Sequence, residues 1–156
     1  MRKRRSAGIL LYRHGPGGLE VFLVHPGGPY WQGKDEGAWS IPKGEYERDE
    51  DPLQAAQREF LEETGQRAEG IFRPLTPVGQ GGGKIVHAWA VEGDLDPDTL
   101  VSNRFPMEWP PGSGSTQAFP EIDRGDWFDV AAAMRKILPA QRPLLDELRT
   151  VTSRPD

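Results

Sequence analysis

Residues 44–65 read GEYERDEDPLQAAQREFLEETG and combine an acidic loop with a short helical pattern. Asp51 is a favourable N-cap, and Pro52 fits the first helical position, where a backbone N–H has no helical partner. Gly65 is a natural end for the helix, because glycine readily adopts the left-handed conformation that closes it. The stretch therefore predicts one helix that begins at Pro52 and ends before Gly65.

Three carboxylates lie on one side of this predicted helix. At about 100° per residue, Glu59, Glu62 and Glu63 occupy a wedge of about 100°, and we expect them to face a cleft. Apolar Phe60 and Leu61 lie on the other flank and are expected to pack on a core. Like charges at these spacings destabilise a helix, and no lysine lies among them. The cluster thus predicts a neutralising partner such as a hard divalent cation, with a solvated acidic face as the alternative.

The complete pattern resembles the Nudix box, Gx5Ex7REUxEExGU, in which U is an aliphatic residue. The matching residues are Gly44, Glu50, Arg58, Glu59, Glu62, Glu63 and Gly65. Phe60 and Gln66 depart from the aliphatic residues that are usual in the box, and both departures concern packing. The preceding WSIPK, residues 39–43, is similar to the approach to the box in dinucleoside polyphosphate hydrolases.

This resemblance implies an α/β fold, in which a mixed β-sheet lies between α-helices. It also implies an enzyme that hydrolyses a pyrophosphate bond in a nucleoside diphosphate derivative. Magnesium or manganese would be held by the three box glutamates and by the backbone carbonyl of Lys43, and one carboxylate would accept the proton of the attacking water. Arg58 is implied to pair with Glu50 and to hold the acidic loop against the helix.

Nudix enzymes commonly bring one more acid from a later loop to the metal, as ligand or general base. Glu121 lies six residues before Trp127, which resembles the spacing in dinucleoside polyphosphate hydrolases, so Glu121 is our first candidate for both roles. Glu108 is the alternative, because bulky neighbours could desolvate it and raise its pKa. Either residue could instead be a solvated loop acid.

Aromatic residues before the box are candidates for binding substrate. Tyr30, Trp31 or Trp39 could stack on a nucleobase, since every base has a π face. In the alternative, Trp39 packs against the core and one of the other two rings covers it. Lys43 is expected to pair with a phosphate or with the acidic loop. We expect His25 to be a hydrogen-bonded histidine at the end of a strand.

Length and composition favour one globular domain over residues 1–156. The absence of cysteine excludes disulfides and fits a reducing compartment, so the cytoplasm is the expected location. No apolar run is long enough to span a membrane. Basic residues 1–5 resemble the start of a signal peptide, but the apolar run that follows is short and ends at Arg13, so we expect a solvated tail.

The remaining pattern predicts strands, then a long loop, then helices. The strands are expected at Ala7–Tyr12, Leu19–Val24, Ala68–Val78 and Lys84–Val91, and the helices at Asp126–Leu138 and Pro139–Val151. Pro74 and Pro77 should interrupt the third strand. Residues 92–124 are rich in proline and glycine, hold at most a short strand, and are expected to form a wall beside the substrate.

The resemblance implies, as the first expectation for the substrate, a dinucleoside polyphosphate similar to Ap4A, or a nucleoside triphosphate. ADP-ribose, inositol pyrophosphates and capped RNA ends are alternatives, and a nucleotide-sensing module without catalysis is the rival from another class. The net charge of −5 offers no broad basic surface, so no stable nucleic-acid partner is expected. The oligomeric state does not follow from the sequence, and a homodimer is one of the options.

Overall fold

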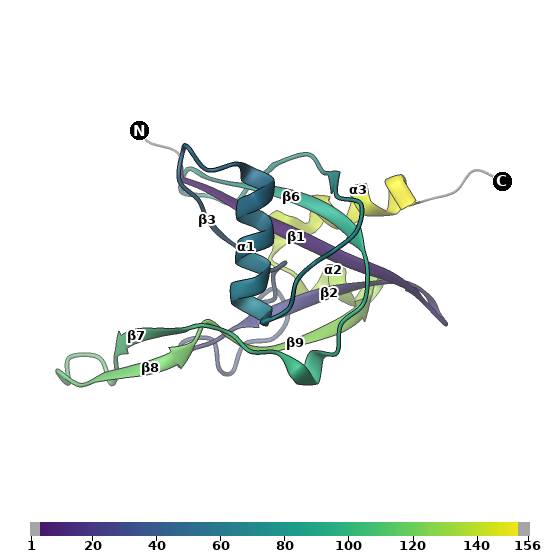
Figure 1. The fold of residues 1–156 in the computed structure, drawn as a ribbon. Helices are drawn as coiled ribbons and strands as arrows, with labels where there is room; N and C mark the ends of the chain where they lie inside the picture. The colour runs from purple at the N-terminus through teal and green to yellow at the C-terminus, as the bar shows by residue number, and fades with distance from the viewer. Residues whose placement is uncertain (1–3, 153–156) are drawn as a thin grey trace.

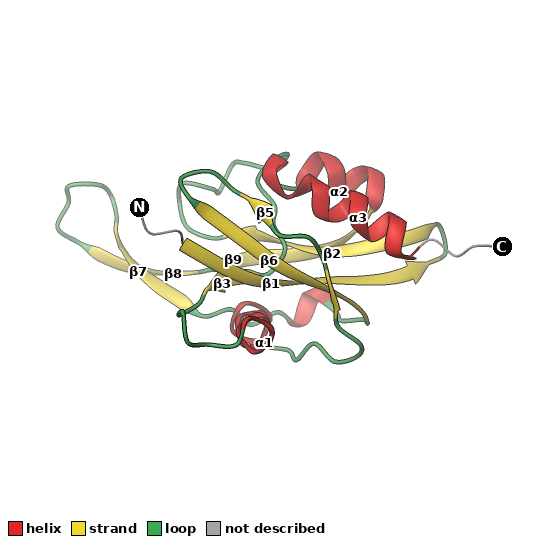
Figure 2. Cartoon of the chain, turned by 90° about the horizontal axis from the view of Figure 1, so that it is seen from above, coloured by secondary structure: helices red, strands yellow, loops and turns green. Residues whose placement is uncertain are grey.

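The computed structural model describes residues 4–152, which form a mixed β-sheet with α1 on one face and α2 and α3 on the other (Figure 1, Figure 2). The elements are β1 (Arg4–Gly15), β2 (Gly18–Pro26), β3 (Lys43–Glu45), α1 (Pro52–Thr64), β4 (Arg73–Pro74), β5 (Val78–Gly79), β6 (Lys84–Glu92), the single-turn 3-10 helix η1 (Pro97–Thr99), β7 (Arg104–Glu108), β8 (Thr116–Pro120), β9 (Ile122–Asp129), α2 (Val130–Lys136), the 3-10 helix η2 (Pro139–Gln141) and α3 (Arg142–Thr152). This arrangement confirms the predicted fold class.

Strand β1 organises the sheet, because it pairs along both edges. One edge runs parallel to β6, and the other is divided between two antiparallel partners. Residues 12–15 pair with β2, whereas Ser6–Gly8 pair with β3. The pairing of β2 with β1 ends at Val21, whereas its other edge pairs with β9 from Glu20 to Pro26. The opening between β2 and β3 leaves room for a cavity that Val24 and Lys43 line.

Two apolar clusters fill the spaces between the sheet and the helices. On the side of α2 and α3 the buried residues include Leu10, Val21, Leu23, Trp39, Ile41, Val86, Ala88, Ile137, Leu144, Leu145 and Leu148. On the side of α1 they include Ala7, Ile9, Leu11, Phe22, Val24, Ala55, Ala56, Phe60 and Val91. Successive β1 residues thus point to opposite clusters, so this strand is buried on both faces.

Helix α1 has the predicted bounds and caps. The Asp51 carboxylate accepts from Gln54 N at 3.0 Å, and Gly65, with a φ of 77°, donates its N–H to Leu61 O at 2.7 Å. Phe60 is buried against the sheet, as predicted, but Leu61 is 37% exposed. The predicted core packing of Leu61 is therefore wrong, because the helix turns this side chain about 100° away from its neighbour Phe60.

The predicted helix Asp126–Leu138 is wrong in its first part. Its first residues belong to β9, where Trp127 pairs with Phe22 of β2. Helix α2 begins only after Asp129, whose side chain accepts from Ala132 N at 2.7 Å. Pairing with a distant strand therefore decided the structure of this segment over its local pattern.

Two other regions also differ from expectation. Residues 92–124 contain β7 and β8, an antiparallel hairpin that projects from the sheet, so the region is more regular than predicted (Figure 1, Figure 2). The predicted strand Ala68–Val78 is reduced to the fragments β4 and β5 on the edge of β6, as its prolines suggested. The last helix begins at Arg142 rather than Pro139, because Pro139–Gln141 form η2.

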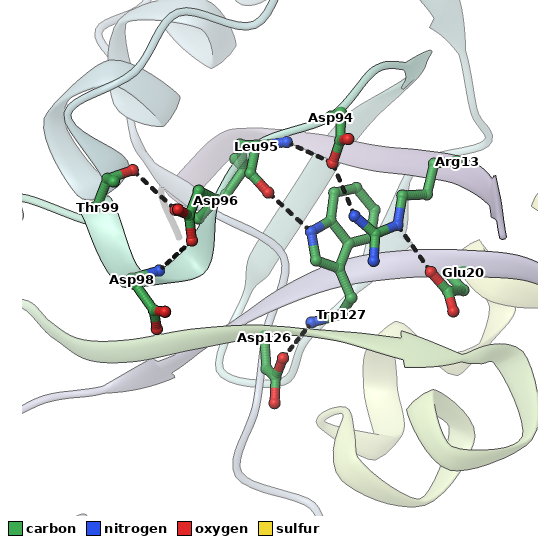
Figure 3. Close-up of polar contacts among 9 residues, drawn as sticks. All are labelled: Arg13, Glu20, Asp94, Leu95, Asp96, Asp98, Thr99, Asp126 and Trp127. Carbon is green, nitrogen blue, oxygen red and sulfur yellow. Dashed lines mark hydrogen bonds and ion pairs between the residues drawn. The ribbon is translucent and has the colours of Figure 1, made fainter.

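The Arg13 side chain connects the sheet to the segment around Asp94, which precedes the β7–β8 hairpin (Figure 3). Its Nε donates to Glu20 at 2.7 Å and its Nη1 to Asp94 at 2.7 Å, while the guanidinium lies 4.0 Å from the centroid of the Trp127 ring. Trp127 Nε1 in turn donates to Leu95 O at 3.0 Å. These contacts join β1, β2 and β9 to the chain that leads into η1 and β7.

The basic tail predicted at residues 1–5 is wrong for its last two members. Arg4 and Arg5 open β1, where they pair with Lys84 and Ile85 of β6. The first three residues lie outside the described part of the chain. Arg4 and Arg5 therefore belong to the sheet, although their side chains are exposed.

Candidate metal and nucleotide site

Glu59 lies beneath β3 instead of facing outward. It is buried, and a Cβ on residue 44 would lie 2.0 Å from Glu59 Oε2, so only glycine at position 44 allows the backbone to approach this carboxylate. Burial, followed by the charge of Glu62, raises the pKa of Glu59. We expected the three box glutamates to face outward into a cleft, but Glu59 is buried against Gly44 of β3.

Arg58 joins the acidic loop to the helix. Its Nε and Nη2 donate to the two carboxylate oxygens of Glu50 at 2.9 and 3.0 Å, which confirms the predicted pair. Its Nη1 also donates to Glu59 at 2.8 Å and to Glu62 at 3.3 Å. The expectation that the carboxylates lack a cationic neighbour is therefore wrong.

Replacing Arg58 with alanine should lower both the thermal unfolding temperature and kcat. The stability loss should be about 1 kcal/mol, because the side chain is 39% exposed and water screens the pair. We expect kcat to fall about 10- to 100-fold, since the box carboxylates lose the group that orients them. Calorimetric unfolding and steady-state kinetics test this, with Arg67→Ala as the control at an exposed position just beyond α1. A change confined to KM would instead place Arg58 on the substrate phosphate.

Glu63 connects the last turn of α1 to β3. The backbone N–H of Lys43 donates to Glu63 Oε1 at 3.2 Å. Burial raises the pKa of Glu63 to about 8, although the Lys43 backbone and ammonium both oppose this shift. Burial also lowers the pKa of Lys43. Both shifts run against what an ion pair alone would produce, so desolvation outweighs the attraction between the two groups.

Glu121 approaches the box from the junction of β8 and β9. Its N–H donates to Asn103 O and its carbonyl accepts from Gly27 N, both at 2.8 Å. Burial, followed by the charge of Glu62, raises the pKa of Glu121. Glu108 is exposed on β7, where its carboxylate accepts from a backbone N–H of the hairpin loop at 2.7 Å. The expected desolvation of Glu108 is therefore wrong.

A cavity of about 240 Å³ opens beside these acids. Its lining residues are Val24, Pro26, Trp31, Ala38, Ser40, Ile41, Lys43, Glu63, Gln80, Glu121, Ile122 and Leu138. The lining thus combines two of the predicted acids and Lys43 with an apolar wall. A pocket that places convergent polar groups beside apolar walls is typical of sites for small ligands.

A buried amide supports the polar part of this lining, and the sequence analysis missed it. Gln141 is fully buried, and its Oε1 accepts from Ile41 N at 3.1 Å. Its Nε2 donates to Ser40 Oγ and to Gln80 Oε1, both at 3.0 Å. Ile41 lies 100 residues from Gln141, so no local pattern could have indicated the contact.

Trp39 belongs to the core and not to a ligand surface. It is 4% exposed, and its Nε1 donates to Asp35 at 2.8 Å. Its predicted role in stacking on a base is therefore wrong, and the core alternative is confirmed. His25 packs against Trp39 and is fully buried, with Nδ1 2.9 Å from Asp123 Oδ1 and Nε2 2.6 Å from Lys34 O. The expectation of a hydrogen-bonded histidine is confirmed.

The other two rings differ in their access to the cavity. Trp31 lines it, and the Lys34 ammonium lies 5.0 Å from the centroid of its ring. Tyr30 is 56% exposed and contacts Trp109, beside the hairpin, edge to face at 5.3 Å. Trp31 is therefore the ring that best fits a role in binding a base.

The acids suit a hard divalent cation by their chemistry. Carboxylates from α1 and from the β8–β9 junction offer only oxygen donors, and burial and mutual repulsion raise the pKa of Glu59, Glu63 and Glu121. Within residues 4–152, no three acidic or histidine side chains are already positioned to hold one ion.

Comparison with known proteins identifies the family. The NUDIX domain family profile matches residues 2–148. The chain belongs to this family. The Nudix domain is 31% identical to a Mycolicibacterium smegmatis protein named 8-oxo-(d)GTP phosphatase, across 90% of this chain and 40% of that protein. It is 27% identical to a Brucella anthropi protein named RNA pyrophosphohydrolase, across 70% of this chain and 67% of that protein.

A solved structure supports the same fold. The Ap4A hydrolase of C. elegans, in a binary complex, superimposes with a TM-score of 0.64 at 23% identity, over 95% of this chain and 96% of the hydrolase. The chain spans only about two fifths of the Mycolicibacterium relative. Family and fold are thus established for this Nudix domain.

Proposed function

We propose that this Nudix domain is a metal-dependent pyrophosphohydrolase that cleaves a phosphate anhydride bond of a nucleotide. The supporting observation is that Glu59 and Glu63 of α1 and Glu121 of a distant segment all have raised pKa values, to which burial and the charges of neighbouring carboxylates contribute. Arg58 offsets part of the repulsion among these acids, and a bound cation would offset more of it. A sensing module would not need so many crowded acids, so the set favours an enzyme. Lys43, beside the same cavity, offers a positive charge to a phosphate.

Each residue has a distinct role in this proposal. A bound magnesium or manganese ion supplies charge neutralisation at the phosphate oxygens and lowers the pKa of the attacking water. Glu59, Glu62 and Glu63 hold the metal, and the Lys43 carbonyl is a further candidate ligand. Glu121 accepts the proton of the water or completes the ligand set. The Trp31 ring supports the base of the nucleotide.

The preferred substrate is a dinucleoside polyphosphate or a nucleoside triphosphate. The names of the relatives, 8-oxo-(d)GTP phosphatase and RNA pyrophosphohydrolase, and the fold of Ap4A hydrolase are compatible with this class. ADP-ribose, inositol pyrophosphates and capped RNA remain candidates for the test, as does a module that binds nucleotides without cleaving them. We further infer that residues 1–156 act as one domain, because the family match spans 2–148 and both cores share one sheet.

No helix within residues 4–152 is long and apolar enough to cross a membrane. Separately, we propose a cytoplasmic location, because a chain without cysteine fits a reducing compartment. A homodimer is one possibility that light scattering of the purified protein can test.

A substrate panel with magnesium tests the proposed activity. Mass spectrometry would identify the products, and ¹⁸O-labelled water would mark the phosphorus that is attacked. We expect cleavage of a nucleotide with one ¹⁸O atom incorporated into one phosphate product, and no cleavage with EDTA. Tight nucleotide binding without turnover of any panel member would favour the sensing module.

Metal binding should release a proton near neutral pH. With a pKa of about 8, Glu63 is protonated at pH 7 in the metal-free protein, and a cation must displace that proton. Affinity for Mg²⁺ should therefore rise with pH up to about 8 and then level off. Calorimetric titration in two buffers of different ionisation heat measures the protons released, and Glu63→Gln should release fewer. A pH-independent affinity would contradict this assignment.

A further inference from the structure

Three cationic side chains share one face of the strands next to the cavity. Arg4 is opposite Lys84 in the parallel β1–β6 register, and Gly8 is opposite Lys43 in the antiparallel β1–β3 register. Partners across a ladder share a face, and so do alternate residues along β1, such as Arg4 and Gly8. Arg4, Lys84 and Lys43 therefore project on the same side. This end of the sheet, where β1 and β6 begin beside β3, is visible in Figure 2.

These cations continue the polar lining of the cavity. Lys43 lines the cavity itself, and Gln80, another lining residue, donates its N–H to Lys84 O at 3.0 Å. Burial is the main reason for the lowered pKa of Lys43, and the positive charge of Lys84 adds to it. The ammonium groups are therefore close enough to repel each other. The cavity thus continues onto a strip of the sheet that carries three cations and one acid, Glu45, which is opposite Ser6 and therefore on the same side.

The outer two cations are poorly neutralised by the protein. The recorded ion pair of Arg4 is with Glu45, at 4.0 Å, with side chains that are 56% and 62% exposed. A pair this open and this long contributes little. Lys84 is also exposed. These two cations stand out on a chain with a net charge of −5. Their grouping favours the binding of an anionic ligand.

We infer that Arg4 and Lys84 bind a phosphate group of the substrate that lies beyond the pyrophosphate under attack. The inference rests on the proposed function and narrows its substrate class to chains of more than two phosphates. Arg4 and Gly8 are about 13 Å apart along β1, at about 3.3 Å per residue. A sugar diphosphate held at the carboxylates does not need the outer cations, whereas a longer polyphosphate or a 5′-triphosphate end continues past Lys43 to them.

Charge-neutral variants test this inference by kinetics. Arg4→Gln/Lys84→Gln should raise KM about 10- to 100-fold for diadenosine tetraphosphate and for an RNA oligonucleotide with a 5′-triphosphate, with kcat nearly unchanged. KM for ADP-ribose should stay within about twofold. Arg67→Gln/Arg149→Gln is the matched control, because it removes the same charge from exposed positions outside the cavity lining. If KM rises for only one of the two long substrates, the inference is supported, and that substrate is identified as the source of the extra phosphate.

Calorimetric binding measurements test this inference independently of catalytic activity. Inorganic tripolyphosphate and pyrophosphate, each with magnesium, would be titrated into the wild type and both double variants. We expect Arg4→Gln/Lys84→Gln to lower the affinity for tripolyphosphate about tenfold or more, and to change the affinity for pyrophosphate by less than about twofold. Equal weakening of both probes, or of neither, would overturn the inference. If no nucleotide were cleaved, the proposed function would fail while this binding test would still decide the role of the two cations.

Discussion

Glu63→Gln is expected to lower kcat by several orders of magnitude while the chain stays folded. Glutamine keeps an oxygen that can accept the Lys43 N–H, so the contact between α1 and β3 can persist. It removes a negative charge from the carboxylates that we propose hold the metal. Glu62→Gln should act in the same direction, since Glu62 shares the Arg58 guanidinium with Glu59. Steady-state kinetics with saturating magnesium on the best substrate measure both effects.

Measurements of the unfolding temperature show whether a variant has lost catalysis alone or has also lost its folded structure. At pH 9, above the pKa of about 8, the folded metal-free wild type must bury an ionised Glu63. The glutamine variant has no such charge, so its unfolding temperature should be equal or higher. Glu69→Gln, at an exposed acid beyond α1, should change neither turnover nor stability. Near wild-type turnover of Glu62→Gln or Glu63→Gln would contradict the proposed metal site.

Glu121→Gln is expected to lower kcat by about 10²- to 10⁴-fold, the usual effect of a positioned acid or base. The backbone on both sides of Glu121 is held by hydrogen bonds to Asn103 and Gly27, so the amide should occupy the same place. KM should change little, because the substitution leaves Lys43 and Trp31 in the cavity wall. Kinetics at saturating magnesium, over a range of pH, measure the loss and show whether a titrating group disappears.

Glu108→Gln is the matched comparison. Glu108 is exposed and contacts the hairpin loop, so its variant should keep wild-type turnover. A large loss in Glu108→Gln alone would transfer the role to that residue. Full activity in both variants would leave the glutamates of α1 as the remaining candidates for the base.

The sequence by itself determined the features that depend on local spacing. The helix bounds follow from the caps at Asp51 and Gly65, and both caps are formed in the structure. The Arg58–Glu50 pair, which the family resemblance implied, also joins residues only eight positions apart. These features are readable because residues this close along the chain have few possible arrangements. The family resemblance added the class of chemistry, which spacing alone left open.

The tertiary structure decided everything that depends on which distant segments meet. Residues 126–128 pair with β2, so they extend as a strand and do not begin a helix. Glu59 is buried by the approach of Gly44, and its pKa therefore follows desolvation more than helix spacing. Gln141 reaches the cavity lining, and Arg4 lies beside Lys84, only through the fold. Burial and strand pairing depend on contacts between residues that are distant along the chain. The local sequence pattern of one segment therefore does not determine them.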